Sequence, residues 1–428
     1  MNHYSKFIYQ LKEKILNYSI KITKGLSLPD KKFITDMFYG LNSSCTVIIS
    51  DIARSLKENI TLKKTVERLS RNICEFDNRD TIYNNYLEEI KDDIEEDTIF
   101  PVDFSEIVKP MSSKMEYLST VHDGSTGRYE KGYGIIEIAA ISSKNKLPVS
   151  VYSEIYSSEE KGFVSVNEEC FKAIDKLQGR FGKVGIYALD RGFDDIKYIE
   201  YFSGNKLNFV IRMTTKRNVI IKEKETNILK VANRVKPICE YNYKDKDGIT
   251  RHAKVGYKKV RLPDLAEEVF YLVVIKNNVY DKPMMLLTNI PATSPEMTRI
   301  VNKAYIQRWK IEEYFKFKKQ QYSFEKIRVM TINGIRNINM ILSILIGMIM
   351  KVAEKGNSLE YKVIFKASKS LRKDMVLVYY AIANGIREIL KTTFKGINQF
   401  YRKSESTNSE QLILLQFSNI NCFTESTA

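Results

Sequence analysis

Residues 185–194 read GIYALDRGFD, a short apolar run that ends in an aspartate and a polar turn. Such runs, bounded by turn signals, are typical of buried strands. Residues 99–103 read IFPVD and have the same design. A sheet delivers the side chains that follow its strands to one edge, so Asp103 and Asp190 converge if their strands are neighbours. The simpler interpretation is that each aspartate is an ordinary turn residue.

The sequence around these two runs predicts a mixed sheet. Runs rich in β-branched and aromatic residues alternate with turn-rich links, and two segments have a helical period. The predicted strands are 99–102, 134–141, 147–156, 185–189 and 208–213, and the predicted helices are 168–178 and 195–202. Three consecutive strands indicate an antiparallel meander. The full order, β-β-β-α-β-α-β, indicates an α/β fold in which helices flank a mixed sheet.

Residues 305–319 read YIQRWKIEEYFKFKK and predict an amphipathic helix. At about 100° per residue, one narrow face collects polar side chains and the opposite side is apolar. The polar face contains Tyr305, Arg308, Glu312 and Lys319, with Trp309 and Lys316 beside it. The alternative is an ordinary row of solvated ion pairs, because pairs four residues apart contribute only about 0.2–0.5 kcal/mol.

A carboxylate in a basic stripe suits metal-dependent phosphoryl transfer. The acid binds Mg²⁺ and the neighbouring cations bind phosphates. One carboxylate cannot hold two metal ions, so we expect Asp103 and Asp190 to join Glu312. Two ions about 3.5–4 Å apart then activate the attacking oxygen and stabilise the leaving oxygen.

The charge of the whole chain favours a polyanionic partner. Lys and Arg number 68 against 52 acidic residues, which gives a net charge of +16, as in proteins that bind nucleic acid. Five dispersed cysteines without CxxC spacing and only three histidines argue against a zinc site and suggest a reducing cytoplasm. The longest apolar run, 338–350, is too short to span a bilayer, so we expect a buried core helix and no membrane association.

The N-terminal region, residues 1–95, has a helical pattern and is interpreted as a DNA-binding region. Residues 50–56 and 61–71 predict two short helices joined by a turn, the second rich in Lys and Arg. Helix-turn-helix elements have this form. Ordinary surface helices with basic residues would have the same pattern.

Residues 214–292 are predicted as a β-rich insertion. Between residues 216 and 261 there are 14 Lys or Arg and five acidic residues. Tyr241, Tyr243 and Tyr257 add ring faces that can stack on bases. The alternative is a solvated hairpin surface. Residues 96–213 and 293–357 then form the two parts of the core, and 358–428 form a helical C-terminal region with a possible role in dimerisation.

The spacing Y-x(2)-R-x(3)-E-x(6)-K resembles the signature of DDE transposases of the fourth insertion-sequence family. Further blocks agree in order: residues 102–105 (VDFS), 123–125 (DGS), 131–133 (KGY), 189–194 (LDRGFD) and 288–291 (TNIP). The resemblance covers about residues 95–350, and four residues at fixed offsets make it specific.

This resemblance implies a ribonuclease-H-like core with a mixed five-stranded sheet, interrupted by a β-rich insertion before the helix that carries Glu312. It also implies catalysis with two Mg²⁺ or Mn²⁺ ions bound by Asp103, Asp190 and Glu312. The DNA partners would be terminal inverted repeats and a target, held by a homodimer in the bacterial cytoplasm at the nucleoid. Tyr305, Arg308 and Lys319 would hold phosphates, with Lys316 and Trp309 as further DNA contacts.

By the same resemblance, water attacks the element end, a hairpin forms and opens, and the 3′-hydroxyl attacks target DNA. A tryptophan in the family's insertion can support a flipped base. The insertion here has no tryptophan, so a tyrosine such as Tyr241, Tyr243 or Tyr257 is expected to replace it.

Three alternatives stay open from the sequence. Asp123 also lies beside a predicted strand, although it heads a Gly and Ser turn, so Asp103 is preferred as the first acid. A transposase-derived protein that binds DNA without cutting it has the same motifs. Another ribonuclease-H-like nuclease, such as a junction resolvase, would cleave DNA without joining it to a target.

Overall fold

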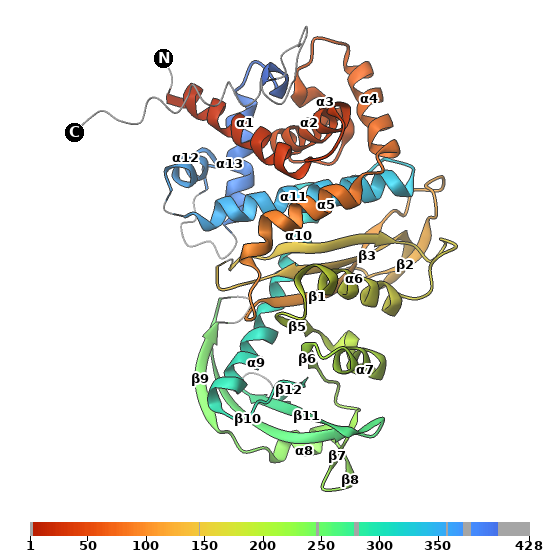
Figure 1. The fold of residues 1–428 in the computed structure, drawn as a ribbon, viewed down its shortest axis with the longest axis vertical. Helices are drawn as coiled ribbons and strands as arrows, with labels where there is room; N and C mark the ends of the chain where they lie inside the picture. Colours follow the sequence, from red (N-terminus) through yellow and green to blue (C-terminus); the bar gives the residue numbers. More distant parts are fainter. Residues whose placement is uncertain are drawn as a thin grey trace, which may run out of the picture.

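The computed structural model describes residues 3–144, 146–244, 248–277, 282–356, 358–370 and 378–400. Three layers follow one another along the long axis of the molecule (Figure 1). A helical body lies at one end, a twisted sheet crosses the middle, and long hairpins form the other end. The candidate acids lie in the middle layer.

Five strands form the centre of the sheet in the spatial order β4-β3-β1-β5-β6. These strands are β1 (Ile99–Val108), β3 (Arg128–Ala140), β4 (Val149–Tyr156), β5 (Ile186–Leu189) and β6 (Asn208–Arg212). The pairs β1–β3 and β3–β4 are antiparallel, whereas β1–β5 and β5–β6 are parallel. The antiparallel meander and the mixed sheet are therefore as expected from the sequence.

Helix α6 (Val166–Phe181) leads from β4 into β5, and helix α7 (Ile196–Gly204) leads from β5 into β6. Each begins at a side-chain cap, because Ser165 accepts a hydrogen bond from the Glu168 amide and Asp195 accepts one from the Lys197 amide. A further strand, β2 (Ser119–Asp123), forms a hairpin with the first half of β3.

The sheet is larger than the five strands expected. The elements of the predicted insertion are β7 (Asn218–Ile221), β8 (Lys224–Asn227), α8 (Ile228–Arg234), β9 (Cys239–Lys244), β10 (Thr250–Leu262), β11 (Leu265–Lys276) and β12 (Met284–Thr288). Strand β12 returns to pair antiparallel with β6, so the hairpins continue the central sheet to twelve strands. An unpaired edge on β6 would leave backbone groups without partners, and β12 covers it.

The helical body combines both ends of the chain. It contains α1 (His3–Ile22), α2 (Leu28–Ser44), α3 (Ile49–Leu56), α4 (Leu62–Glu75), α5 (Arg79–Ile90), α11 (Ile332–Glu354), α12 (Leu359–Ala367) and α13 (Tyr379–Lys391). Across the described part of the chain, short 3₁₀ turns occur at Lys91–Asp93, Arg191–Phe193, Phe324–Lys326 and Ile397–Phe400. Tyr379, Ile382 and Ile386 of α13 are buried in the main hydrophobic core. The predicted C-terminal region also includes residues 371–377 and 401–428, which lie outside the described residues.

Helix α11 lies on the side of the helical body that faces the sheet (Figure 1). It is the one helix in the described part of the chain that is long and apolar enough to cross a membrane, and 89% of its most apolar window is buried inside the protein. A helix that is apolar on all sides fits a site enclosed by other elements. The prediction of a buried core helix at residues 338–350 is confirmed.

Candidate active site

Asp103 lies where β1 leaves its parallel partner. Residues 99–101 pair with residues 186–188 of β5, and from Val102 onward β1 pairs only with β3. We expected the strand to end just before Asp103, but β1 continues to Val108. It is β5 that ends, and this leaves the edge of β1 beside Asp103 open. The Asp103 side chain is 21% exposed, and its Oδ1 accepts a hydrogen bond from the Phe104 amide at 3.0 Å.

Asp190 directly follows β5, as predicted. Its Oδ1 accepts a hydrogen bond from the Gly192 amide at 2.7 Å, which caps a 3₁₀ turn. Pro101 pairs with Ala188 in the parallel register, and the two aspartates each lie two residues beyond this pair. Neighbouring strands are about 4.8 Å apart, so the register brings Asp103 and Asp190 side by side where the strands separate.

An aromatic pair connects the segments that carry the two aspartates. Phe104 follows Asp103 and stacks on Phe193, three residues after Asp190, with ring centroids 5.4 Å apart and planes 13° apart. Stacked rings of this kind contribute about 0.5–1.5 kcal/mol beyond their buried area. The stack therefore limits how far the two segments can separate.

The signature region is two helices joined at a bend. Helix α9 (Pro295–Gln307) ends before Arg308, and α10 (Trp309–Gln321) begins after it. The Arg308 amide bonds to the Tyr305 carbonyl and the Ile311 amide to the Arg308 carbonyl, both at 3.1 Å. These are three-residue spacings, which wind the backbone more tightly than an α-helix does.

The bend changes the predicted polar face. Tyr305 is only 8% exposed and packs among the apolar residues between α9 and the sheet. Its hydroxyl accepts a hydrogen bond from Arg212 at 3.5 Å, and the Arg308 guanidinium lies 5.9 Å from its ring centre. The sequence predicts one polar face shared by Tyr305 and Arg308. The two side chains do lie side by side, but Tyr305 is buried against the sheet.

Arg308 links two of the three candidate acids. Its Nη1 lies 3.5 Å from Asp103 Oδ2, and its Nη2 donates a hydrogen bond to Glu312. Glu312 is 48% exposed, whereas Arg308 is 11% exposed. Helix α10 therefore presents Glu312 toward the open edge of β1.

Charge and burial together perturb Asp103. Burial raises the pKa of its carboxyl to about 7, the Arg308 charge lowers it, and the charges of Asp190 and Glu312 raise it. Both other candidate acids are thus close enough to act on Asp103 electrostatically. The structure thus places Asp190 and Glu312 within electrostatic reach of Asp103.

A divalent ion suits the chemistry of this donor set, because Mg²⁺ and Mn²⁺ prefer carboxylate oxygens. In the described part of the chain, no three acidic, histidine or cysteine side chains are close enough to hold an ion as they stand. Arg308 explains part of this spacing, because its guanidinium lies between Asp103 and Glu312. The residues fit a metal by their chemistry, and an ion would have to draw them together.

The other predicted DNA contacts on α10 differ in their availability. Lys316 is exposed and lies 3.6 Å from Glu313, and Trp309 is partly exposed. Lys319 lies at the far end of α10, with its Nζ 3.3 Å from Glu106 and 3.1 Å from Glu325. Two carboxylates thus already neutralise Lys319.

Asp123, the alternative first acid, closes its own hairpin turn. Its carboxylate accepts hydrogen bonds from the Ser125 amide at 2.8 Å and from the Ser125 and Thr126 hydroxyls at 2.6 and 2.8 Å. These bonds lower the pKa of Asp123 to about 2. The geometry fits a structural turn residue.

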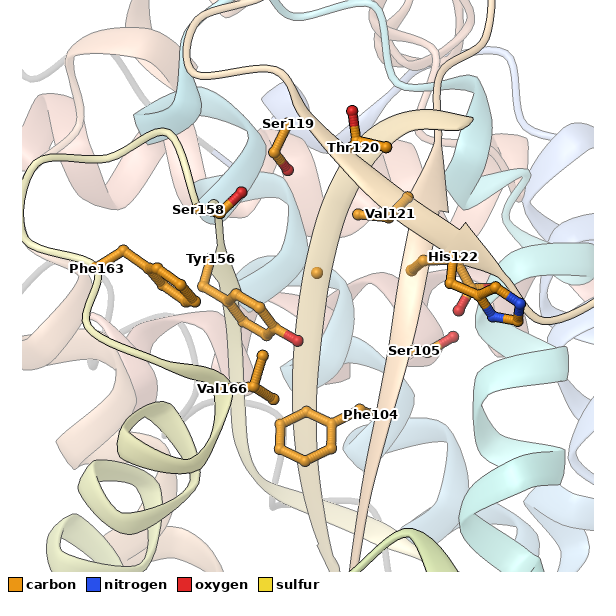
Figure 2. A pocket seen from close by; sticks show the side chains of 12 residues that line it. Phe104, Ser105, Ser119, Thr120, Val121, His122, Tyr156, Ser158, Phe163 and Val166 are labelled. Carbon is orange, nitrogen blue, oxygen red and sulfur yellow. The ribbon is translucent and has the colours of Figure 1, made fainter. Parts of the chain in front are cut away.

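A groove of about 290 Å³ lies beside Asp103 and has no counterpart in the sequence expectations. Phe104, Tyr156 and Phe163 form an aromatic side, with Ser105 and His122 across from them (Figure 2). Tyr156 stacks on Phe163 with ring centroids 5.9 Å apart. The lining comes from β1, β2, β3, β4 and the segment before α6, so no local pattern could have indicated it.

The predicted helix pair near the N-terminus is present as α3 and α4. Arg68 is engaged inside the body, because it donates hydrogen bonds to Glu58 at 2.9 and 3.0 Å and to Asp36 at 2.9 Å. The exposed cations of α4 are Lys63, Lys64 and Arg71.

The insertion tyrosines are partly covered. Tyr241 on β9 is hydrogen-bonded to Asn302 of α9, and Arg299 lies 5.3 Å from its ring centre. Tyr243 accepts a hydrogen bond from Asn277 at 3.4 Å. The rings of Tyr257 and Tyr271 lie side by side, with centroids 6.4 Å apart. Tyr241 thus lies beside the helix that leads to Arg308.

Carboxylates gathered at a sheet edge, under a helix that carries cations, are the features of proteins that act on nucleic-acid phosphates. Residues 97–348 match the family described as the transposase DDE domain. The match covers more than half of the chain, and the protein belongs to this family.

No curated protein matches the chain. Among solved structures, the cryo-EM structure of the piggyBac transposase synaptic complex with hairpin DNA is similar at 12% sequence identity and a TM-score of 0.42. The alignment covers 99% of this chain and 84% of that chain.

Proposed function

We propose that this protein is an active DNA transposase whose catalytic acids are Asp103, Asp190 and Glu312. The observation that carries the proposal is the parallel register of β1 and β5, which brings the two aspartates together where the strands part. Arg308 contacts both Asp103 and Glu312, and so links Glu312, the third acid, to the pair of aspartates. Two Mg²⁺ or Mn²⁺ ions are the proposed cofactors.

The proposed core is ribonuclease-H-like. The strand order β4-β3-β1-β5-β6, with an antiparallel first half and a parallel second half, supports this assignment. The proposed organisation has a DNA-binding region at 1–95, core segments at 96–213 and 293–357, an insertion at 214–292 and a C-terminal region at 358–428. In this organisation the insertion is a continuation of the core sheet, because β12 pairs with β6.

In the proposed reaction, the chain positions a DNA phosphodiester beside the three acids. The metal pair supplies activation of the attacking oxygen and stabilisation of the leaving oxygen. Asp103, Asp190 and Glu312 would hold the ions, Arg308 would bind the phosphate beside them, and Lys316 and Lys319 would contact phosphates further along α10. Tyr305 positions Arg308 through ring contact rather than through an exposed hydroxyl.

The proposed substrates are the terminal inverted repeats of an insertion sequence and a target DNA. Hydrolysis at the element end, a hairpin intermediate and strand transfer are the proposed steps. The exposed Lys63, Lys64 and Arg71 of α4 are proposed to contact DNA away from the cleaved end. Joining two ends implies a homodimer in the synaptic complex.

The test is cleavage and strand transfer on DNA that carries the sequences flanking the reading frame. Asp103→Asn, Asp190→Asn and Glu312→Gln are each expected to lower cleavage by at least about 10³-fold and to keep end binding within about twofold, because each change removes a charged metal ligand. Asp123→Asn is the control and is expected to cleave normally. Wild-type cleavage in EDTA would overturn the proposal.

A second candidate is a DNA-binding descendant that no longer cuts. The separation of the acids in the described residues, with Arg308 between two of them, favours this candidate. It predicts end binding without nicking at any Mg²⁺ or Mn²⁺ concentration. Cleavage that is followed by joining to a target would exclude both this candidate and a simple nuclease.

A further inference from the structure

A fully buried ion pair lies beneath the candidate active site. The side chains of Lys318 on α10 and Glu137 on β3 are both 0% exposed, and Lys318 Nζ lies 3.3 Å from Glu137 Oε2. The two residues are 181 positions apart in the chain. Moving two charges out of water is costly, so a pair in this position requires an explanation other than stability.

Serine hydroxyls complete the partners of both charges. Lys318 donates hydrogen bonds to Ser343 of α11 at 2.8 Å and to Ser153 of β4 at 3.2 Å. Ser153 in turn donates to Glu137 at 2.7 Å, and Ser150 donates to the other carboxylate oxygen. The network therefore joins α10 to two strands of the sheet and to α11.

The two charged residues of this network lie on the same elements as, or beside, two of the proposed catalytic acids. Glu137 is the direct register partner of Asp103 across β1 and β3, and opposite residues in an antiparallel pair project from the same face. Lys318 follows Glu312 by six residues on α10. One half of the ion pair is thus fixed to the strand beside Asp103, and the other half to the helix that carries Glu312.

Apolar packing alone would hold α10 less specifically. Apolar contacts are non-directional, so they do not by themselves fix one position of a helix along a sheet. Hydrogen bonds to a buried ammonium depend on distance and angle, and a shift would leave buried groups unpaired. The helix needs this constraint because it starts at the bend at Arg308 and because Glu312 projects toward solvent.

We infer that Glu137 and Lys318 are a positioning pair that sets the place of Glu312 relative to Asp103. Both side chains are fully buried, so the inference gives them no direct contact with DNA or metal. This inference rests on the proposed function, since it assumes that the acids bind divalent ions. Its consequence is that the ion affinity of the acids depends on a contact made on the buried side of α10.

The test measures ion binding without DNA cleavage. Mn²⁺ is titrated into the full chain by calorimetry or by electron paramagnetic resonance, and fold and stability are followed by circular dichroism. The paired variant Glu137→Gln with Lys318→Met removes both charges and nearly conserves volume. It is expected to fold and to bind Mn²⁺ about tenfold more weakly, as outer-shell partners of metal ligands typically do when mutated.

A control removes a charge pair of the helical body in which Asp36 is buried and Lys32 is 37% exposed. Lys32 and Asp36 of α2 form an ion pair of 2.7 Å in the helical body, with the Asp36 side chain fully buried. Lys32→Met with Asp36→Asn should change the melting temperature and leave the Mn²⁺ dissociation constant within twofold. A role that is only structural would move both paired variants alike.

Ser343→Ala keeps the test decisive if the paired variant fails to fold. It removes one acceptor of Lys318 and leaves both charges in place, and a loss of about threefold in Mn²⁺ affinity is expected. Unchanged Mn²⁺ affinity in a folded Ser343→Ala or paired variant would overturn the inference. If the wild-type chain binds no Mn²⁺, the proposed function itself fails, and the two failures are thus distinguishable.

Discussion

At the scale of single residues, Asp103 has a perturbed pKa. Its carboxyl is partly buried and faces two like charges, and Arg308 compensates only in part. Its pKa of about 7 is above the ordinary value of 3.8. The folded chain therefore binds a proton at Asp103 between about pH 4 and pH 7 that the unfolded chain releases.

This raised pKa predicts how stability depends on pH without metal. The contribution of Asp103 is fully present below pH 4 and is lost as pH rises toward 7, because the charged form is disfavoured in the folded state. Asp103→Asn removes that charge. In EDTA, the variant should be more stable than wild type at pH 8, by on the order of 2–4 kcal/mol, and similar at pH 4. Urea unfolding at both pH values measures this, and an equal difference at both would contradict it.

Individual residues also show which features of the site the sequence predicts. Strand patterns and motif spacing indicated Asp103, Asp190 and Glu312 as candidates, because such signals are local. The burial of Tyr305 did not follow, since it depends on a bend that the helical period cannot reveal. The pairing of Lys318 with Glu137 joins residues 181 positions apart, and no single-sequence pattern carries such a contact.

At the scale of elements, close packing of α12 and α13 is set by a glycine. A Cβ at Gly385 of α13 would lie 2.0 Å from the Ile364 carbonyl of α12. The two helices touch through their backbones at this point, and an added methyl group would force them apart.

Gly385→Ala is accordingly expected to destabilise the protein by about 1–3 kcal/mol, because a methyl group forced into a packed contact shifts the backbone. Gly179→Ala on α6 is the matched control, since a Cβ there meets no atom within 4 Å. That change should stabilise by about 0.5–1 kcal/mol, as alanine fixes the helical backbone better than glycine. Thermal melts of both variants are the measurement, and equal effects would argue against close contact.

The elements themselves were well predicted where their period was strong. The central strands and the helices α6 and α7 occur close to the expected residues. The hairpin β2 was missed because its five residues border a turn-rich segment. The pairing of β12 with β6 was also missed, since sequence patterns indicate strands but not their distant partners.

At the scale of the whole molecule, the insertion and the core share one sheet. Strand β6 pairs with β5 on one side and with β12 on the other. An insertion that formed a separate domain would open independently of the core. A continuous ladder opens as one unit.

Hydrogen exchange tests this continuity. Amides of β5, β6, β12 and β11 are expected to exchange with similar protection, within about 1 kcal/mol, because their hydrogen bonds break together. Mass spectrometry of peptides from these strands gives the comparison, with the exposed hairpin β7–β8 as an internal reference. Fast exchange in β11 and β12 beside slow exchange in β5 would show that the insertion unfolds alone.

The shared sheet also gives the hairpins a mechanical connection to Asp190. Adjacent strands held by hydrogen bonds resist sliding, so a force applied to β10 or β11 passes through β12 and β6 to β5. Strand β5 ends at the residue before Asp190. A ligand that pulled on the hairpins would thus exert tension on the strand that anchors one of the proposed catalytic acids.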